Sequence, residues 1–314
     1  MPKYPHLPLI MAVNKVSEGS GKIPTDWSQL DFVTDRNNLR KLLRWAGGDT
    51  SHDFRIDLQL AGKNTVIMSR WEPKDREEFS GRTFGLNFVK SSTHIAPGCK
   101  DSCGHHRIVK YVCQIPTCRD LLNVRQDLNG LSMVVRFSVD ACLPPPVRFS
   151  RRSTGNIDEL MRSFNAVTLS PSLSTSRSEP RITILEGGSE IPPNTLMEIC
   201  TRSEVNLKKN GFDWTEALPQ LWFSQIIHHT LAVHQRGRFI SIERRKIPQS
   251  AASNEQGRLK KLRKVLGLIQ EVVREYGKEE RLTLVCVGGS LRLYRRTTRE
   301  LCLPESALKL FESS

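Results

Sequence analysis

The stretch Leu196–Ser203, with the sequence Leu-Met-Glu-Ile-Cys-Thr-Arg-Ser, is the most informative part of the chain. It is short and rich in apolar and β-branched residues, which is typical of a buried or half-buried strand. Glu198 lies inside it. A carboxylate in apolar surroundings is costly unless it is paired, protonated or bound to a metal ion. The stretch therefore predicts a strand with a functional carboxylate.

A second stretch of the same kind is Leu131–Ala141, with the sequence Leu-Ser-Met-Val-Val-Arg-Phe-Ser-Val-Asp-Ala. It also predicts a strand, and it contains Asp140. We expect the carboxylates of Asp140 and Glu198 to lie on neighbouring strands and to converge on one cavity.

The pair Asp140 and Glu198-x-Cys200 has the order of the D…(D/E)-x-K pattern of metal-dependent nucleases. In that chemistry, carboxylates bind Mg²⁺ or Mn²⁺ through oxygen and a lysine orients or deprotonates water. Here Cys200 stands at the lysine position. Ion pairs of the two carboxylates with Arg136 or Arg202 explain the pattern equally well.

The charge balance favours a polyanionic partner. Among 314 residues, 47 are Lys or Arg and 33 are Asp or Glu, which gives a formal net charge of +14 and a pI of about 9.6. Such an excess favours RNA or DNA. The alternative is a basic protein without such a partner.

The expected location is the nucleus and/or the cytoplasm, with no membrane contact. No apolar run approaches the ~18–20 residues needed to cross a bilayer. The first residues contain a short apolar patch that prolines interrupt, so we do not interpret them as a signal peptide. Eight cysteines in such a chain favour reduced thiols.

We expect a flexible tail over residues 1–22 and a single domain over 23–314. Within the domain, residues 144–181 are rich in Ser, Arg and Pro and predict a mobile loop. Helical and strand patterns are mixed and no internal repeat is present. The predicted fold class is therefore α+β, with a central mixed β-sheet flanked by helices.

Periodicity and turn signals place the elements within that fold. The predicted helices are 31–45, 79–90, 214–229, 255–276 and a last one from 304. The predicted strands are 54–60, 65–71, 105–111, 131–141, 181–185, 195–201, a pair within 231–243, 282–287 and 291–294.

Residues 112–126 interrupt a hairpin. Without them, Lys110–Tyr111 would align with Gly130–Met133 across an Asn-Gly turn, the strongest short hairpin signal. The 15 residues correspond to 45 nucleotides, and Val-Cys and Gln can be encoded as GTATGT and CAG, which resemble splice sites. We interpret the segment as a retained intron; the alternative is a genuine surface insertion, which a hairpin end tolerates.

Several stretches together resemble the decapping exoribonuclease family. Residues 31–36 (Asp-Phe-Val-Thr-Asp-Arg) resemble its first arginine motif, and 84–89 (Phe-Gly-Leu-Asn-Phe-Val) resemble its Gly-Tyr-Lys-Phe-Glu motif. Residues 138–140 stand where the family has Glu-x-Asp, and 198–201 where it has Glu-(Leu/Ile)-Lys-Thr. Residues 221–225 (Leu-Trp-Phe-Ser-Gln) match its tryptophan-rich segment ending in glutamine.

The resemblance implies removal of incomplete or non-canonical RNA 5′ caps, with 5′–3′ exonuclease activity in some members. By position, Arg36 and Gln225 would contact RNA or cap phosphate. Asp140 and Glu198 would be the catalytic, metal-binding carboxylates, with Mg²⁺ or Mn²⁺ as the metal if the protein is active and no cofactor otherwise. The implied partner is RNA with a capped or 5′-phosphorylated end, and a protein partner is left open.

Three positions depart from the family pattern. Val89 and Ser138 replace metal-binding glutamates, and Cys200 replaces the catalytic lysine. Hard cations need several anionic oxygens, so these changes predict a degenerate metal site that is weakly active or inactive. The alternative is a non-catalytic module that binds RNA or a protein partner.

A third interpretation comes from similar fungal proteins, which are often labelled geranylgeranyl pyrophosphate synthetases. Prenyl synthases bind diphosphate through Mg²⁺ held by DDxxD-type clusters, and the sequence contains no Asp-Asp pair. Such an enzyme would also be mostly helical.

Overall fold

The computed structural model describes residues 3–20, 25–72, 84–96, 106–111, 128, 130–144, 182, 184, 191–245 and 249–312. The side chains of 20, 106–111 and 249–255 are not described. The described residues before 144 and after 183 belong to one compact unit, and all that follows concerns this unit.

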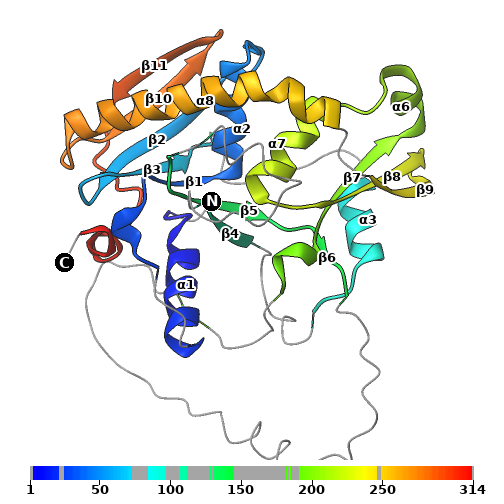
Figure 1. Ribbon diagram of the computed structural model, residues 1–314, viewed down its shortest axis with the longest axis horizontal. Coiled ribbons are helices and arrows are strands. Elements are labelled where there is room, and N and C mark those ends of the chain that lie inside the picture. Colours follow the sequence, from blue (N-terminus) through cyan, green and yellow to red (C-terminus); the bar gives the residue numbers. More distant parts are fainter. Residues whose placement is uncertain are drawn as a thin grey trace, which may run out of the picture. The chain divides into compact units, whose positions relative to one another are not determined.

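Two β-sheets form the framework (Figure 1). The larger has seven strands in the order β11-β10-β2-β3-β1-β5-β4. In it, β1 is parallel to β3 and β5, and the other pairs are antiparallel. The strands are β1 (Phe32–Asp35), β2 (Phe54–Ala61), β3 (Thr65–Arg70), β4 (His106–Tyr111), β5 (Met133–Ser138), β10 (Leu282–Val287) and β11 (Ser290–Arg295).

The smaller sheet has four strands in the order β6-β7-β8-β9. Its central pair, β7 and β8, is parallel, and the outer pairs are antiparallel. The strands are β6 (Ala141–Cys142), β7 (Leu196–Ser203), β8 (His228–Gln235) and β9 (Arg238–Arg245), and the short helix η2 (Pro193–Thr195) precedes β7.

Three helices cover one face of the larger sheet: α2 (Arg36–Ala46), α7 (Trp214–Ser224) and α8 (Gln249–Tyr276). In Figure 1, α8 runs along α2 and α7, which both contact it. The buried positions of α8 recur every three or four residues, as an amphipathic helix requires. Each buried aliphatic side chain contributes about 1.5–3 kcal/mol; they are Leu259, Leu262, Leu266, Ile269 and Val273.

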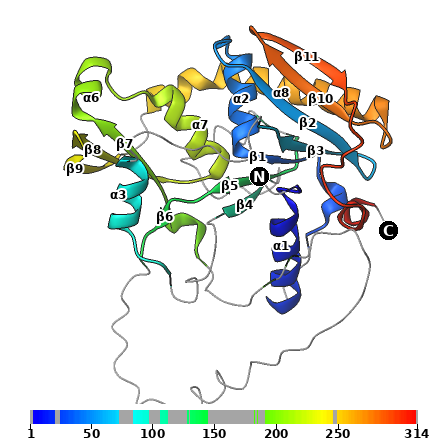
Figure 2. The same ribbon diagram turned by 180° about the vertical axis from the view of Figure 1, so that it is seen from behind.

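The smaller sheet has its own helix. Figure 2 shows α3 (Phe84–Ser92) beside β7, β8 and β9. Gly85 allows this close packing, because a Cβ there would lie 3.1 Å from Oγ1 of Thr201 in β7. The ring of Phe88 lies 4.4 Å from that of Phe239 in β9, and the two ring planes are tilted by 42°. A further short helix, α6 (Glu204–Asn210), follows β7 directly.

Both chain termini lie on the opposite face of the larger sheet. They form α1 (Leu7–Ser20), η1 (Trp27–Gln29), α9 (Glu305–Leu308) and η3 (Lys309–Phe311). The rings of Trp27 and Phe311 meet edge to face at 5.8 Å. The expectation of a flexible tail over residues 1–22 is therefore wrong for residues 3–20. Prolines are tolerated in the first turn of a helix, and Pro8 lies there.

The predicted α+β class, with a mixed sheet flanked by helices in a single domain, is confirmed. The hairpin register is also close to the prediction, since Tyr111 pairs with Met133 and Lys110 with Val134. Residues 112–126 and 145–181, which include the proposed insertion and the expected loop, lie outside the described residues. Within the described ranges, no helix is long and apolar enough to cross a membrane.

The strand predicted over 181–185 is not formed at its described residues, 182 and 184. Three further predicted elements need correction. The helix predicted over 31–45 is a strand followed by a helix, β1 and α2. The strand predicted over 131–141 breaks after Ser138, where the chain leaves one sheet for the other. The helix predicted over 214–229 ends at Ser224, because Gln225 adopts the left-handed conformation.

The N-terminal helix offers a direct test of its packing. Ile10 is 2% exposed and Val16 is 63% exposed on the same helix. We expect Ile10→Ala to lower the free energy of unfolding by about 2–5 kcal/mol. The matched control Val16→Ala should change it by about 0.5 kcal/mol or less. Urea denaturation measures both, and equal small effects would mean that α1 does not pack on the sheet.

Candidate functional site

Asp140 lies where the chain passes from the larger sheet to the smaller one. It directly precedes β6, whose Ala141 is paired with Met197 of β7, so it stands beside Glu198. Its Oδ2 accepts a hydrogen bond from the backbone N–H of Ile199 at 2.8 Å. The change of sheet therefore brings together two carboxylates that are far apart in the sequence.

Arg36 approaches Glu198 from helix α2, which follows strand β1 of the larger sheet. It is the first residue of α2, directly after β1. Its Nη1 donates to Oε2 of Glu198 at 2.8 Å, and its Nη2 to Oε1 at 3.4 Å. The side chains are only 15% and 10% exposed. Such a two-pronged, charge-assisted pair is among the stronger hydrogen-bonded contacts in proteins.

Two further arginines extend this contact along α2. Arg40 and Arg44 follow Arg36 at helical spacing, so all three lie on one face of α2. Arg40 donates to Glu216 of α7 at 2.9 Å, and Arg44 donates to it at 3.5 Å. Arg40 and Arg44 therefore link α2 to α7, and Arg36, the first arginine of this row, binds Glu198.

Gln220 connects that row to the carboxylate. With its amide oriented to suit both neighbours, its nitrogen donates to Oε1 of Glu198 at 2.7 Å and its oxygen accepts from Nη2 of Arg40 at 3.0 Å. Sequence reasoning missed Gln220, Arg40 and Glu216. The repeat of arginine every four residues in α2 was the available signal.

Burial sets the protonation of the acids. It raises the pKa of Glu198, which neighbouring Asp140 raises further and Arg36 lowers. Burial likewise raises the pKa of Asp140, whereas the hydrogen bond from the Ile199 N–H and the charge of Arg36 lower it. It also raises the pKa of the Cys200 thiol. These groups therefore favour their neutral forms more than exposed groups do.

The described residues do not fit a divalent metal ion. They contain no group of three or more His, Cys, Asp or Glu that could hold one. Both oxygens of Glu198 already accept from Arg36, and one oxygen of Asp140 accepts from a backbone N–H. Mg²⁺ and Mn²⁺ would have to displace these donors to obtain anionic oxygens.

Of the three departing positions, only Cys200 is shown to lie beside the carboxylates, since Glu198 and Asp140 both act on its thiol. Cys200 is two residues after Glu198 on β7, so the two share a face of the sheet. Ser138 ends β5, two residues before Asp140, and is exposed. Val89 lies one turn beyond Gly85 on α3, the helix that packs on β7.

Gln225 adjoins the site through its neighbour Ser224, whose hydroxyl lies 3.5 Å from Nη1 of Arg36. Gln225 caps α7 in the left-handed region, with φ of 54°. Its Nε2 is buried without a hydrogen-bond partner. A buried donor left unpaired costs about 1–3 kcal/mol, which a ligand acceptor would offset.

The alternative ion pairs proposed from the sequence are wrong in their partners. Arg136 pairs with Asp35, with Nη2 3.0 Å from Oδ2. Arg202 donates to the backbone carbonyl of Thr201 at 2.9 Å. Glu198 does have an arginine partner, but it comes from α2, 162 residues away in the chain.

Comparison with known proteins places this fold in a wider group. The model of a family described as a domain of unknown function (DUF8563) matches residues 20–288. No curated protein matches the sequence. Several solved structures share the fold.

Three of these structures come from different yeasts. S. pombe Rai1 in complex with 3′-FADP has a TM-score of 0.56 and 15% identity, over 91% of this chain and 77% of that one. Candida albicans Rai1 in complex with pU5-Mn²⁺ has a TM-score of 0.51 and 10% identity, over 96% of this chain and 78% of that one. Scheffersomyces stipitis Rai1 in complex with (3′-NADP)⁺ and calcium has a TM-score of 0.51 and 12% identity, over 95% of this chain and 75% of that one. The chain thus has the decapping exoribonuclease fold predicted from its motifs.

The ion pair between Arg36 and Glu198 predicts a pH-dependent variant. Arg36→Ala leaves a buried carboxylate unpaired, which should cost about 3–5 kcal/mol of unfolding free energy at pH 8. The pKa of Glu198 is already above its ordinary 4.5 and rises further without Arg36. A carboxyl with a raised folded pKa loses stability as pH rises from the ordinary value through the raised one.

The loss should therefore be smaller at pH 5 than at pH 8 in denaturant titrations. The same substitution in a Glu198→Gln background is the control, and its cost should vary less with pH, because only the effect of Arg36 on Asp140 remains. An equal cost at both pH values in the two backgrounds would contradict the pairing.

Proposed function

Since the chain belongs to the DUF8563 family and has the decapping exoribonuclease fold, we propose that it binds RNA 5′ ends and hydrolyses them weakly or not at all. The binding residues are Arg36 and Gln225, which recognise the terminal phosphate or cap. Asp140 and Glu198 are the remaining carboxylates of the hydrolytic site. The proposed location is the nucleus or cytoplasm.

The binding half of the proposal is supported by charge and by unsatisfied donors. The net charge of +14 attracts RNA independently of sequence. Nε2 of Gln225 lacks an acceptor, and phosphate oxygens are strong acceptors. The fold neighbours are complexes with nucleotide ligands, 3′-FADP for S. pombe Rai1 and pU5 for the C. albicans protein.

The weak-activity half rests on one observation, the engagement of Glu198 with Arg36 through both carboxylate oxygens. The neighbours that carry Mn²⁺ or Ca²⁺ suggest that the fold uses divalent metal. In this chain, Val89, Ser138 and Cys200 supply neither carboxylate nor lysine near the pair. A non-catalytic RNA-binding module is therefore the limiting case of the same proposal. A prenyl synthase, expected to be mostly helical, fits poorly with two β-sheets.

Restoring the missing groups tests the proposal. We expect the triple variant Val89→Glu, Ser138→Glu, Cys200→Lys to raise Mn²⁺-dependent release from capped RNA far more than any single change, because such groups act as a unit. Calorimetric Mn²⁺ titration should show binding by the triple variant and little by the unaltered chain. The double variant Val89→Gln, Ser138→Gln provides similar bulk without charge and serves as the control.

Two results would count against it. Turnover by the unaltered chain as fast as by the triple variant would contradict the weak-activity half. Equal affinity of Arg36→Gln and the unaltered chain for 5′-phosphorylated RNA would contradict the binding half.

A further inference from the structure

One row of polar side chains crosses the smaller sheet from the site outward. Glu198 of β7 is paired with His229 of β8, which is paired with Arg245 of β9. Directly paired residues point to the same face of a sheet. Adjacent strands are ~4.8 Å apart, so the backbone of Arg245 lies about 10 Å from that of Glu198. This is within one or two nucleotides of an RNA chain held at Arg36.

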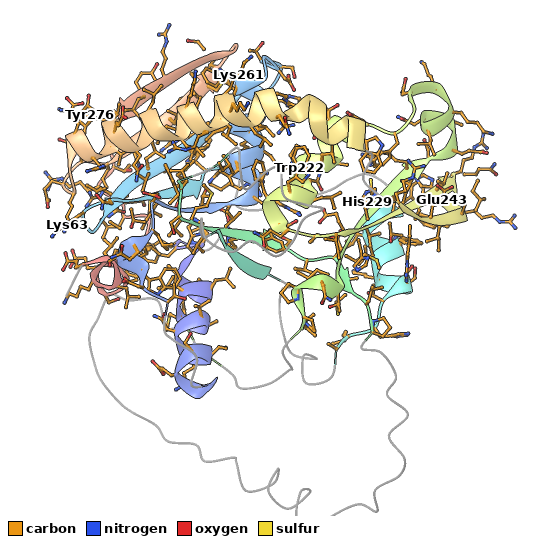
Figure 3. The ribbon with its side chains drawn as sticks, in the orientation of Figure 1. Lys63, Trp222, His229, Glu243, Lys261 and Tyr276 are labelled. Atoms are coloured by element: carbon orange, nitrogen blue, oxygen red, sulfur yellow. The ribbon has the colours of Figure 1, made fainter. Side chains whose placement is uncertain are left out.

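Aromatic rings cover the outer half of this row. Phe212 meets Trp214 edge to face at 4.9 Å, and its ring is tilted against that of His229 at 5.2 Å. The Arg245 guanidinium lies 4.9 Å above the Phe212 ring. Figure 3 shows His229 between Trp222 of α7 and Glu243 of β9. Aromatic rings and arginine planes are the surfaces on which unpaired RNA bases stack.

His229 is the unusual member of this cluster. It is 2% exposed, and its Nδ1 has no hydrogen-bond partner. Burial, Arg245 and Arg202 lower its pKa to about 4, so the ring is neutral at physiological pH. A neutral imidazole offers one donor and one acceptor, and a buried one without a partner calls for an explanation.

Packing alone accounts for only part of the cluster. Trp214 packs against both hydrophobic clusters and has a structural role. Phe212 belongs to neither cluster and is half-buried. The ion pair of Arg245 with Glu243, at 3.2 Å, involves a carboxylate that is 52% exposed, and such exposed pairs hold a side chain weakly. Arg245 is therefore free to take another partner.

We propose that Phe212, His229 and Arg245 form a nucleobase site for single-stranded RNA. A base stacks against the Arg245–Phe212 pair, and His229, whose Nδ1 is buried, packs against the Phe212 ring at 5.2 Å. The site rests on the proposed function, because it receives a base one or two nucleotides from the 5′ end held near Arg36 and Glu198.

The test compares Arg245 with its neighbour on the strand. Arg245→Lys keeps the charge and removes the planar surface, while Arg244→Gln removes one charge from the opposite, exposed face of β9. The probe is a 5′-phosphorylated single-stranded decamer, measured by fluorescence anisotropy with and without abasic nucleotides at positions 2 and 3. Base stacking predicts that Arg245→Lys weakens binding of the intact decamer about 5- to 150-fold.

Two further results are expected. Arg245→Lys should leave the affinity for the decamer that lacks the stacked base unchanged relative to the unaltered chain. Arg244→Gln should weaken both RNAs equally and slightly, as loss of one distant charge does.

The outcomes separate this inference from the function beneath it. Normal binding of the intact decamer by Arg245→Lys, or the same loss with both decamers, would overturn the nucleobase site while leaving 5′-end binding intact. Failure of the unaltered chain to bind the decamer would overturn the proposed function and this site with it. Binding that ignores the 5′ phosphate but still depends on Arg245 and on the base would overturn only the assignment to RNA 5′ ends.

Discussion

The buried ion pair between Arg36 and Glu198 is the contact on which the rest of the site depends. It joins α2, which follows the first strand of the larger sheet, to β7 in the smaller one. Two charges removed from water must be compensated by each other and by further hydrogen bonds. Gln220 and Ser224 of α7 provide these bonds. The geometry between the two sheets is thereby tied to the geometry of the site.

The same pair limits the chemistry. A carboxylate that coordinates a hard cation must be ionised and must have free oxygen lone pairs. Glu198 offers its oxygens to a guanidinium, and burial raises its pKa. An arginine that donates hydrogen bonds to a phosphate must in turn break those that it donates to its carboxylate. Arg36 and a metal ion would therefore compete for the same two oxygens of Glu198.

The motif order was enough to predict much of the result from the sequence. The short strands around Asp140 and Glu198, the long amphipathic helix α8 and the hairpin of β2 and β3 follow from local periodicity, which packing did not override. The juxtaposition of Asp140 and Glu198 could be proposed because both acids stand in apolar stretches, where an isolated charge is too costly. The decapping-nuclease fold could be proposed from the ordered series of short motifs.

Other features depended on contacts between distant segments. The N-terminal helix could not be predicted from the sequence, because its prolines suggest disorder. Burial of Leu7 and Ile10 against the sheet stabilises it. The partner of Glu198 was also hidden, since Arg136 and Arg202 are nearer in sequence but point elsewhere. The sequence by itself determined which side chains must be paired, because the cost of burying a charge is a local property. Only the tertiary structure decided which partners these side chains have. Arg36 reaches Glu198 from α2. Asp140 reaches β7 because β5 and β6 lie in different sheets and the chain between them turns toward β7.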